Sequence, residues 1–120
     1  MSVDAVVAKL AAWTEHDFHK DRQLADEVLI ADGWQCEPNA EFEGGERWFW
    51  GTNPQYSSGG PGRPHPVNDM NAAIGVVPFG KNWSLSVSGN YAVAHVGSHS
   101  GTSCNPTIAL LIAALKCRPL

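Results

Sequence analysis

The chain has few charged residues and no long apolar run. Only 17% of its 120 residues are charged, and eight Lys and Arg stand against twelve Asp and Glu, which gives a net charge of −4. Because phosphate binding depends on clustered basic side chains, this balance argues against nucleic acid as a partner. The longest apolar run, 108–115, is far shorter than the ~20 residues that a membrane-spanning helix needs. We therefore expect neither nucleic acid nor a membrane as a partner.

Cysteine is also scarce and odd in number, with only Cys36, Cys104 and Cys117. An odd count without a recognisable signal peptide predicts free thiols in a reducing cytosol. A chain of this length is typical of one domain. We therefore expect a single domain over residues 1–120 in the cytoplasm.

Helical patterns occur at both ends of the chain. Asn105 and Pro106 fit the cap and first position of a helix that continues to about residue 118. That helix is apolar all round, so other elements must cover most of its faces. Apolar positions three and four apart predict a first helix from Val3 to Trp13, and a second helix is expected over about 20–32, ended by Gly33. A short helix is expected over about 68–77.

Strand patterns fill much of the remainder. Residues 83–88 alternate strictly between apolar residues and serine, and Gly89-Asn90 separates them from a second run, 91–96. This pattern predicts a β-hairpin, and the aromatic run 47–50 predicts another strand. Residues 36–45 are polar and turn-rich, and 54–66 are rich in Gly and Pro, which predicts an exposed, mobile loop. The expected fold is α+β, with a small, mostly antiparallel sheet packed between helices as an α/β/α sandwich.

The order of these features resembles the phage ABA sandwich family and, more distantly, NinX-like phage proteins. The resemblance rests on Gly33-Trp34, the run Arg47-Trp48-Phe49-Trp50, the helix 68–74 leading to Pro78, and Asn105-Pro106. It extends over about residues 20–118. It implies an accessory protein of a phage or prophage, located in the cytoplasm of the bacterial host. It implies no catalytic residues.

Residues capable of chemistry are present but poorly spaced. His95, His99 and Cys104, with His65, could supply zinc ligands, but their spacing gives neither helix nor knuckle geometry, so no metal ligands are predicted. Cys104 directly precedes Asn105, and a helix N-terminus favours a thiolate. An enzyme that uses Cys104 with His99 or a bound metal is therefore one alternative.

Acidic residues are concentrated in the first 46 positions, and only Asp69 lies beyond them. They form either a solvated face or a surface that grips a basic host protein. Trp48 and Trp50 share one face of the expected strand, which becomes a contact patch if that face is open. The loop 54–66 lacks the Lys of a Walker motif, so it is either a connector or a binding loop.

Together with the phage resemblance, these patterns predict a non-catalytic protein that binds and inhibits a host (defence) protein, with no cofactor. Alternatives are a sequestering binder of a small nucleotide signal, with its pocket at the subunit interface of a homo-oligomer, and a structural component without a pocket. The candidate contacts with a partner or ligand are Asp17, Asp21, Asp26, Trp48, Trp50, Arg63, His65 and His99.

Overall fold

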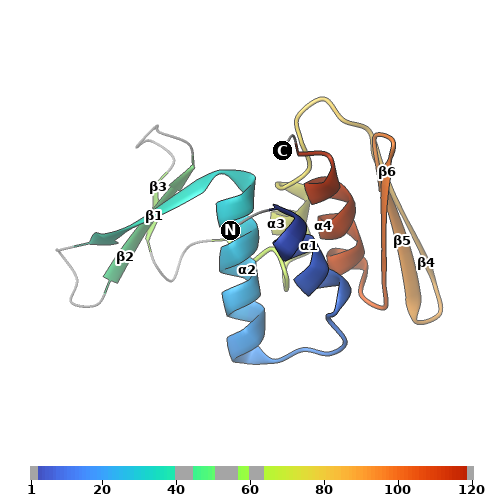
Figure 1. The fold of residues 1–120 in the computed structure, drawn as a ribbon, viewed down its shortest axis with the longest axis horizontal. Coiled ribbons are helices and arrows are strands. Elements are labelled where there is room, and N and C mark those ends of the chain that lie inside the picture. Colours follow the sequence, from blue (N-terminus) through green and yellow to red (C-terminus); the bar gives the residue numbers. More distant parts are fainter. Residues whose placement is uncertain (1–2, 40–44, 51–56, 60–63, 119–120) are drawn as a thin grey trace.

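A computed structural model describes residues 3–39, 45–50, 57–59 and 64–118 (Figure 1). Four helices and six strands lie in these ranges. In chain order they are α1 (Val3–Ala11), α2 (Phe18–Asp32), β1 (Trp34–Asn39), β2 (Gly45–Trp50), β3 (Ser57–Gly59), α3 (Met70–Ile74), β4 (Trp83–Ser88), β5 (Tyr91–Val96), β6 (His99–Ser103) and α4 (Pro106–Lys116).

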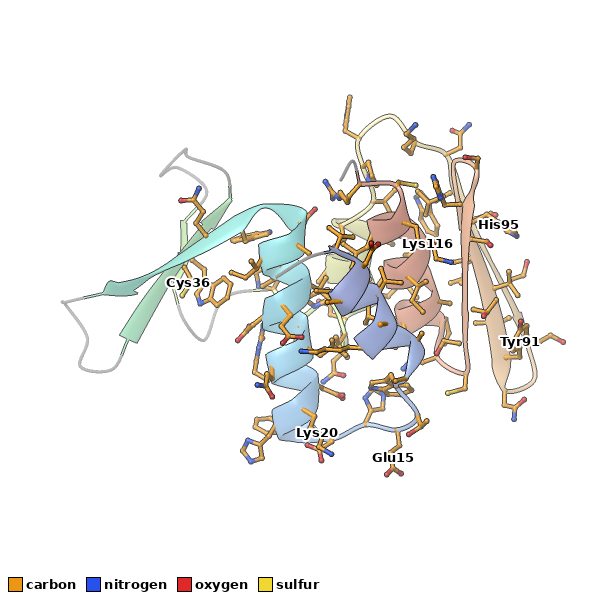
Figure 2. All side chains as sticks on the ribbon, viewed as in Figure 1. Glu15, Lys20, Cys36, Tyr91, His95 and Lys116 are labelled. Carbon is orange, nitrogen blue, oxygen red and sulfur yellow. The ribbon has the colours of Figure 1, made fainter. Side chains whose placement is uncertain are left out.

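Strands β4, β5 and β6 form an antiparallel sheet in that order. The hairpin expected from the alternating pattern is confirmed, and Gly89 supplies the positive φ of its turn, 61°. Alternate residues of β5, namely Ala92, Ala94 and Val96, are buried against α4. Tyr91 and His95 project from the other face of the sheet into solvent (Figure 2).

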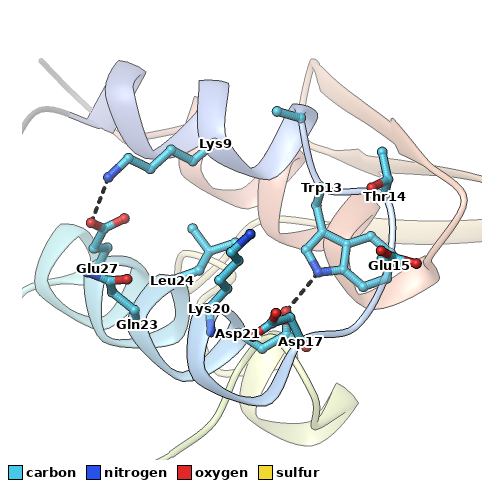
Figure 3. Close-up of a pocket in the computed structure, with 11 residues that line it drawn as sticks. Lys9, Trp13, Thr14, Glu15, Asp17, Lys20, Asp21, Gln23, Leu24 and Glu27 are labelled. Atoms are coloured by element: carbon cyan, nitrogen blue, oxygen red, sulfur yellow. Dashed lines mark hydrogen bonds and ion pairs between the residues drawn. The ribbon is translucent and has the colours of Figure 1, made fainter.

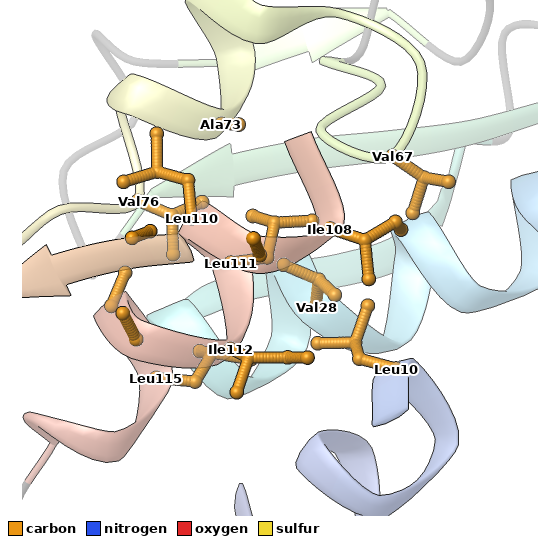
Figure 4. Packing of buried hydrophobic residues seen from close by; sticks show 14 of the residues in the cluster. Leu10, Val28, Val67, Ala73, Val76, Ile108, Leu110, Leu111, Ile112 and Leu115 are labelled. Atoms are coloured by element: carbon orange, nitrogen blue, oxygen red, sulfur yellow. The ribbon is translucent and has the colours of Figure 1, made fainter. Parts of the chain in front are cut away.

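Helix α4 lies between this sheet and the helices α1 and α3 (Figure 1). The cap is as expected, because the Asn105 Oδ1 accepts a hydrogen bond from the Thr107 amide at 2.8 Å. Every side chain over 108–115 is buried, in contact with apolar residues of several elements (Figure 4). The α+β class is thus confirmed. The middle layer is a helix, α4, with the sheet β4–β5–β6 on one side of it and the helices α1 and α3 on the other. No helix in the described ranges is long and apolar enough to cross a membrane.

Strand β6, which begins at His99, is an element that the sequence pattern did not predict. It pairs with β5 from Val96↔His99 to Ala92↔Ser103, although its sequence lacks the apolar alternation of a strand. Gly101 explains its position, because a Cβ atom there would lie 2.4 Å from the Ala109 carbonyl oxygen of α4 and 2.8 Å from the Ala113 nitrogen. The strand can cross the helix this closely only without a side chain at Gly101.

The second sheet, β1–β2–β3, extends from the C-terminal end of α2 (Figure 1). The aromatic strand is confirmed as β2, but two of its neighbours correct the sequence-based expectations. In the turn-rich segment 36–45, residues 36–39 belong to strand β1 and 40–44 lie outside the described ranges, and part of the expected loop 54–66 is strand β3. In both cases backbone pairing with β2 outweighs weak local strand propensity. At the end of that loop Pro66 and Val67 are buried, so the chain there is not exposed; residues 54–56 and 60–63 lie outside the described ranges.

Candidate functional site

A groove of about 460 Å³ lies between α1 and α2 and along the connector between them (Figure 3). We call it the α1–α2 groove. Its size falls within the range of ligand-binding clefts. Its charged lining comprises the carboxylates of Glu15, Asp17, Asp21 and Glu27 and the ammonium groups of Lys9 and Lys20, and the side chains of Trp13 and Leu24 add apolar surface.

The connector owes its shape to the two helix ends that it joins. Helix α1 ends with a backbone hydrogen bond from Trp13 to the Leu10 carbonyl, at 3.1 Å. Asp17 then caps α2, because its side chain accepts a hydrogen bond from the Lys20 amide at 3.0 Å. The second helix therefore begins at Phe18, two residues earlier than the sequence pattern predicts. Residues 13–17 are held between these two caps.

Asp21 holds the connector in place through hydrogen bonds to two of its residues. It is only 2% exposed, and its two oxygens accept hydrogen bonds from Trp13 Nε1 at 2.9 Å and from His16 Nδ1 at 2.8 Å. Burial by itself raises the pKa of Asp21, but the hydrogen bonds from His16, from Trp13 and from the backbone outweigh it and lower that pKa. Asp21 is thus an ionised acceptor, which assigns a proton to Nδ1 of His16.

The connector also contacts the start of α4. His16 Nε2 lies 3.4 Å from the Asn105 Nδ2, and the Cys104 thiol lies 3.8 Å from the Thr14 carbonyl oxygen. A second, shallower depression of about 390 Å³ is lined by His16, Phe18, Asp21 and Asn68. Asp21 thus lies between two hollows of the surface. Phe18 stands at the edge of the second one and is 80% exposed.

The lysines of the groove differ in their pairing. Lys9 reaches across from α1 and forms an ion pair with Glu27 at 2.7 Å. Lys20, in contrast, forms no ion pair with another residue in the described ranges. Glu15 and Lys20 both lie at the connector end of the helices (Figure 2). Four carboxylates against two ammonium groups leave the groove with a surplus of two negative charges.

The structure separates the acidic residues that were candidate contacts. Asp17 and Asp21 both line the groove, but Asp21 is buried, which corrects its assignment to an exposed acidic face. Asp26 lies outside the groove and pairs with Arg22 at 2.6 Å. That pair lies within α2, whereas Asp32 pairs with Arg118 near the C-terminal end of the chain and so joins α2 to another part of the fold.

Of the aromatic candidates and the basic candidate, the structure describes the side chain of Trp48, which does not line the groove. Trp48 is 3% exposed, so it is not available as a contact patch. The side chains of Trp50 and Arg63 lie outside the part of the chain that the structure describes.

The histidine candidates are dispersed as well. His65 is half-buried beside Arg22, and burial, followed by the charge of Arg22, lowers its pKa. His99 is exposed at the start of β6, whereas Cys104 follows the end of that strand, so His99 does not approach the thiol. The register Val96↔His99 and His95↔Ser100 sets His95 and His99 on opposite faces of the sheet. Among the described residues no group of three possible metal ligands is found.

Sequence reasoning missed most of the groove. The sequence pattern places Trp13 only at the end of an apolar helix stripe, and it gives no sign that Lys9 and Lys20 share a site. The available signal was the loss of helical period after Trp13, in a short segment that combines an aromatic, a histidine and two acidic residues. Such a segment between two amphipathic helices is a natural place for exposed functional groups.

No family model, curated protein or solved structure matches this chain. The resemblance to the phage ABA sandwich family therefore stays a prediction, and the groove's function has to be inferred from its geometry.

Proposed function

We propose that this is a non-catalytic binding protein that contacts another protein through the α1–α2 groove and the connector beside it. Following the phage resemblance, the partner is a host protein, such as a defence enzyme, that is inhibited by the contact in the cytoplasm of the bacterial host. The observation that carries the proposal is the groove of about 460 Å³ with its surplus of carboxylates. Such a surface attracts a partner of opposite charge and guides its approach.

The connector has two further properties of a protein-binding surface. Trp13 lines the groove and Phe18 is 80% exposed beside it, and aromatic side chains contribute disproportionately to protein interfaces. The hydrogen bonds of Asp21 hold Trp13 and His16 in one arrangement. A preorganised surface loses less conformational entropy when a partner binds.

The charge of the groove also favours a protein over a small nucleotide. Phosphate groups would approach four carboxylates and only two lysines, one of which, Lys9, is already paired with Glu27. Phosphate sites instead gather Lys, Arg or backbone amides. A basic protein surface meets no such repulsion.

The test is capture from host lysate followed by identification of the captured protein by mass spectrometry. The variant is the double substitution Glu15→Gln and Asp17→Asn, which removes two charges but keeps an N-cap acceptor at position 17. Asp69→Asn is the matched control, because Asp69 also caps a helix, through the Asn71 amide, and lies outside the groove.

We expect the wild-type protein and the control to capture the same host protein in a salt-sensitive manner, and the double variant to bind the purified partner at least about tenfold more weakly in calorimetry. Equal binding by all three proteins, or no host protein recovered, would refute the proposal.

A thiol enzyme is a second candidate, favoured by one observation. The His16 ring, oriented by buried Asp21, lies 3.4 Å from the side-chain amide of Asn105, the residue that follows Cys104. The Cys104 thiol lies 3.8 Å from the Thr14 carbonyl oxygen of the connector. An imidazole oriented by a carboxylate is the usual partner of a nucleophile. Cys104→Ala separates the two functions: the binding proposal expects unchanged capture and unchanged inhibition of the partner, whereas the enzyme requires loss of the effect with the fold intact.

A further inference from the structure

We infer that the occupant of the α1–α2 groove is an arginine side chain from a basic segment of the partner protein, seated against Trp13 near the carboxylates of Glu15 and Asp17. This inference rests on the proposed function and names the chemistry by which that site selects its partner.

The pairing of the groove residues locates the uncompensated charge. Glu27 forms an ion pair with Lys9, and Asp21 is only 2% exposed, with one oxygen accepting from Trp13 and the other from His16. The remaining charged groups are the carboxylates of Glu15 and Asp17 and the ammonium group of Lys20, so the connector end keeps one negative charge that no groove lysine balances. Asp17 uses one oxygen to cap α2, but a carboxylate has several acceptor sites and can receive a second donor.

Trp13 supplies the second half of the site. Its indole nitrogen is bound to Asp21, and its ring meets the His16 ring edge-on, with centroids 4.9 Å apart and planes at 77°. Both contacts fix the ring, which lines the groove together with Glu15 and Asp17 (Figure 3). Tryptophan is the aromatic side chain with the strongest attraction for a cation over its face.

A guanidinium group matches both features at once. It is planar, so it can stack on an indole, and its five N–H donors can bind a carboxylate at the rim of the ring. A lysine can offer charge but neither the stacking nor the paired donors. A phosphorylated or acidic segment would be repelled by Glu15 and Asp17.

The experiment titrates the purified protein with N-acetyl-arginine amide and records the Trp13 indole N–H and the connector amides by NMR. N-acetyl-citrulline amide is the matched neutral ligand, because it keeps the planar shape without the charge. A Trp13→Phe protein assigns the indole signal among the five tryptophans. The amides of β5 and β6 on the far side of α4 serve as an internal reference.

We expect saturable shifts of Trp13, Glu15 and Asp17 with the arginine ligand, at least fivefold weaker binding of the citrulline ligand, and loss of the shifts in the double variant Glu15→Gln and Asp17→Asn. Equal binding of both ligands, shifts centred elsewhere, or no saturable shift would overturn the inference. Because this measurement needs no host protein, its failure is distinct from failure of the lysate capture, which alone decides whether a partner binds the groove.

Discussion

The two sides of α4 are built on different principles. Toward β5 and β6 the contact is apolar and very close, with small residues of the helix directly against Gly101. Toward the start of α4 the neighbouring connector is polar, and its position depends on hydrogen bonds that converge on one buried carboxylate, Asp21. An added atom at Gly101 should destabilise the contact between β6 and α4. Loss of an acceptor at Asp21 should destabilise the connector.

The difference indicates that the sheet side of this small protein mainly stabilises the fold, whereas the connector side presents groups for recognition. The sheet side exposes few groups near α4 that could act on a partner, because its inner face is occupied by packing. The connector side keeps Glu15, Asp17 and Phe18 exposed while their backbone is held by the caps and by Asp21. A rigid base below a polar, exposed loop is the usual construction of a binding site.

The largest effect should come from adding one methyl group on the sheet side. Gly101→Ala is expected to lower the free energy of unfolding by about 1–3 kcal/mol, because its Cβ would overlap backbone atoms of α4 that cannot move aside. Urea denaturation measures this change, and Thr102→Ala, an exposed neighbour on the same strand, serves as the control. If Gly101→Ala unfolds at the same urea concentration as the control, the close contact between β6 and α4 is wrong.

A smaller effect is expected from Asp21→Asn on the connector side. The asparagine can still accept from Trp13, but charge-assisted hydrogen bonds become neutral ones, which should cost about 1–2 kcal/mol at pH 7. Since folding lowers the pKa of Asp21, its stabilisation is complete above the unfolded value of about 4 and is lost as the pH falls through the folded value. The difference between wild type and variant should therefore be constant from pH 5 to 7 and shrink in more acidic solution. A constant difference down to pH 2 would contradict this role of Asp21.

The elements that could be predicted are those whose own residues specify them. Asn105, Pro106 and the apolar run after them define α4, and the strict alternation from Trp83 specifies the hairpin. In contrast, β1 contains Pro38 and β6 contains Gly101, and each is a strand only because a neighbour pairs with its backbone. Pairing between distant segments leaves no local pattern to read.

The candidate site was less predictable than the fold, for a related reason. The acidic excess of the N-terminal half was visible, but its division into capping, buried and exposed carboxylates depends on tertiary contacts. Asp21 and Asp17 are alike in sequence and four residues apart, yet one is buried under Trp13 and the other lies at the surface. The connector that brings Trp13 and His16 onto Asp21 has no regular structure, so no periodicity could reveal it.

The smallest predicted effect concerns His65, in the segment before α3. Its Nδ1 is buried and has no hydrogen-bond partner among the described residues, and Arg22, which donates to the Pro64 carbonyl oxygen at 2.9 Å, lies close by. Burial first, and then the charge of Arg22, lower the pKa of His65. Between the unfolded value of about 6.5 and the lower folded value, the unfolded chain binds more protons, so stability must fall as the pH decreases through this window.

His65→Gln should lose less stability than wild type between pH 7 and pH 5, as measured by thermal unfolding. His95→Gln, on the exposed face of the sheet, controls for the change of residue type. If His65→Gln keeps the full wild-type dependence on pH, His65 is not buried beside Arg22, and the contrast between a closely packed and a polar side of the molecule does not extend to this segment.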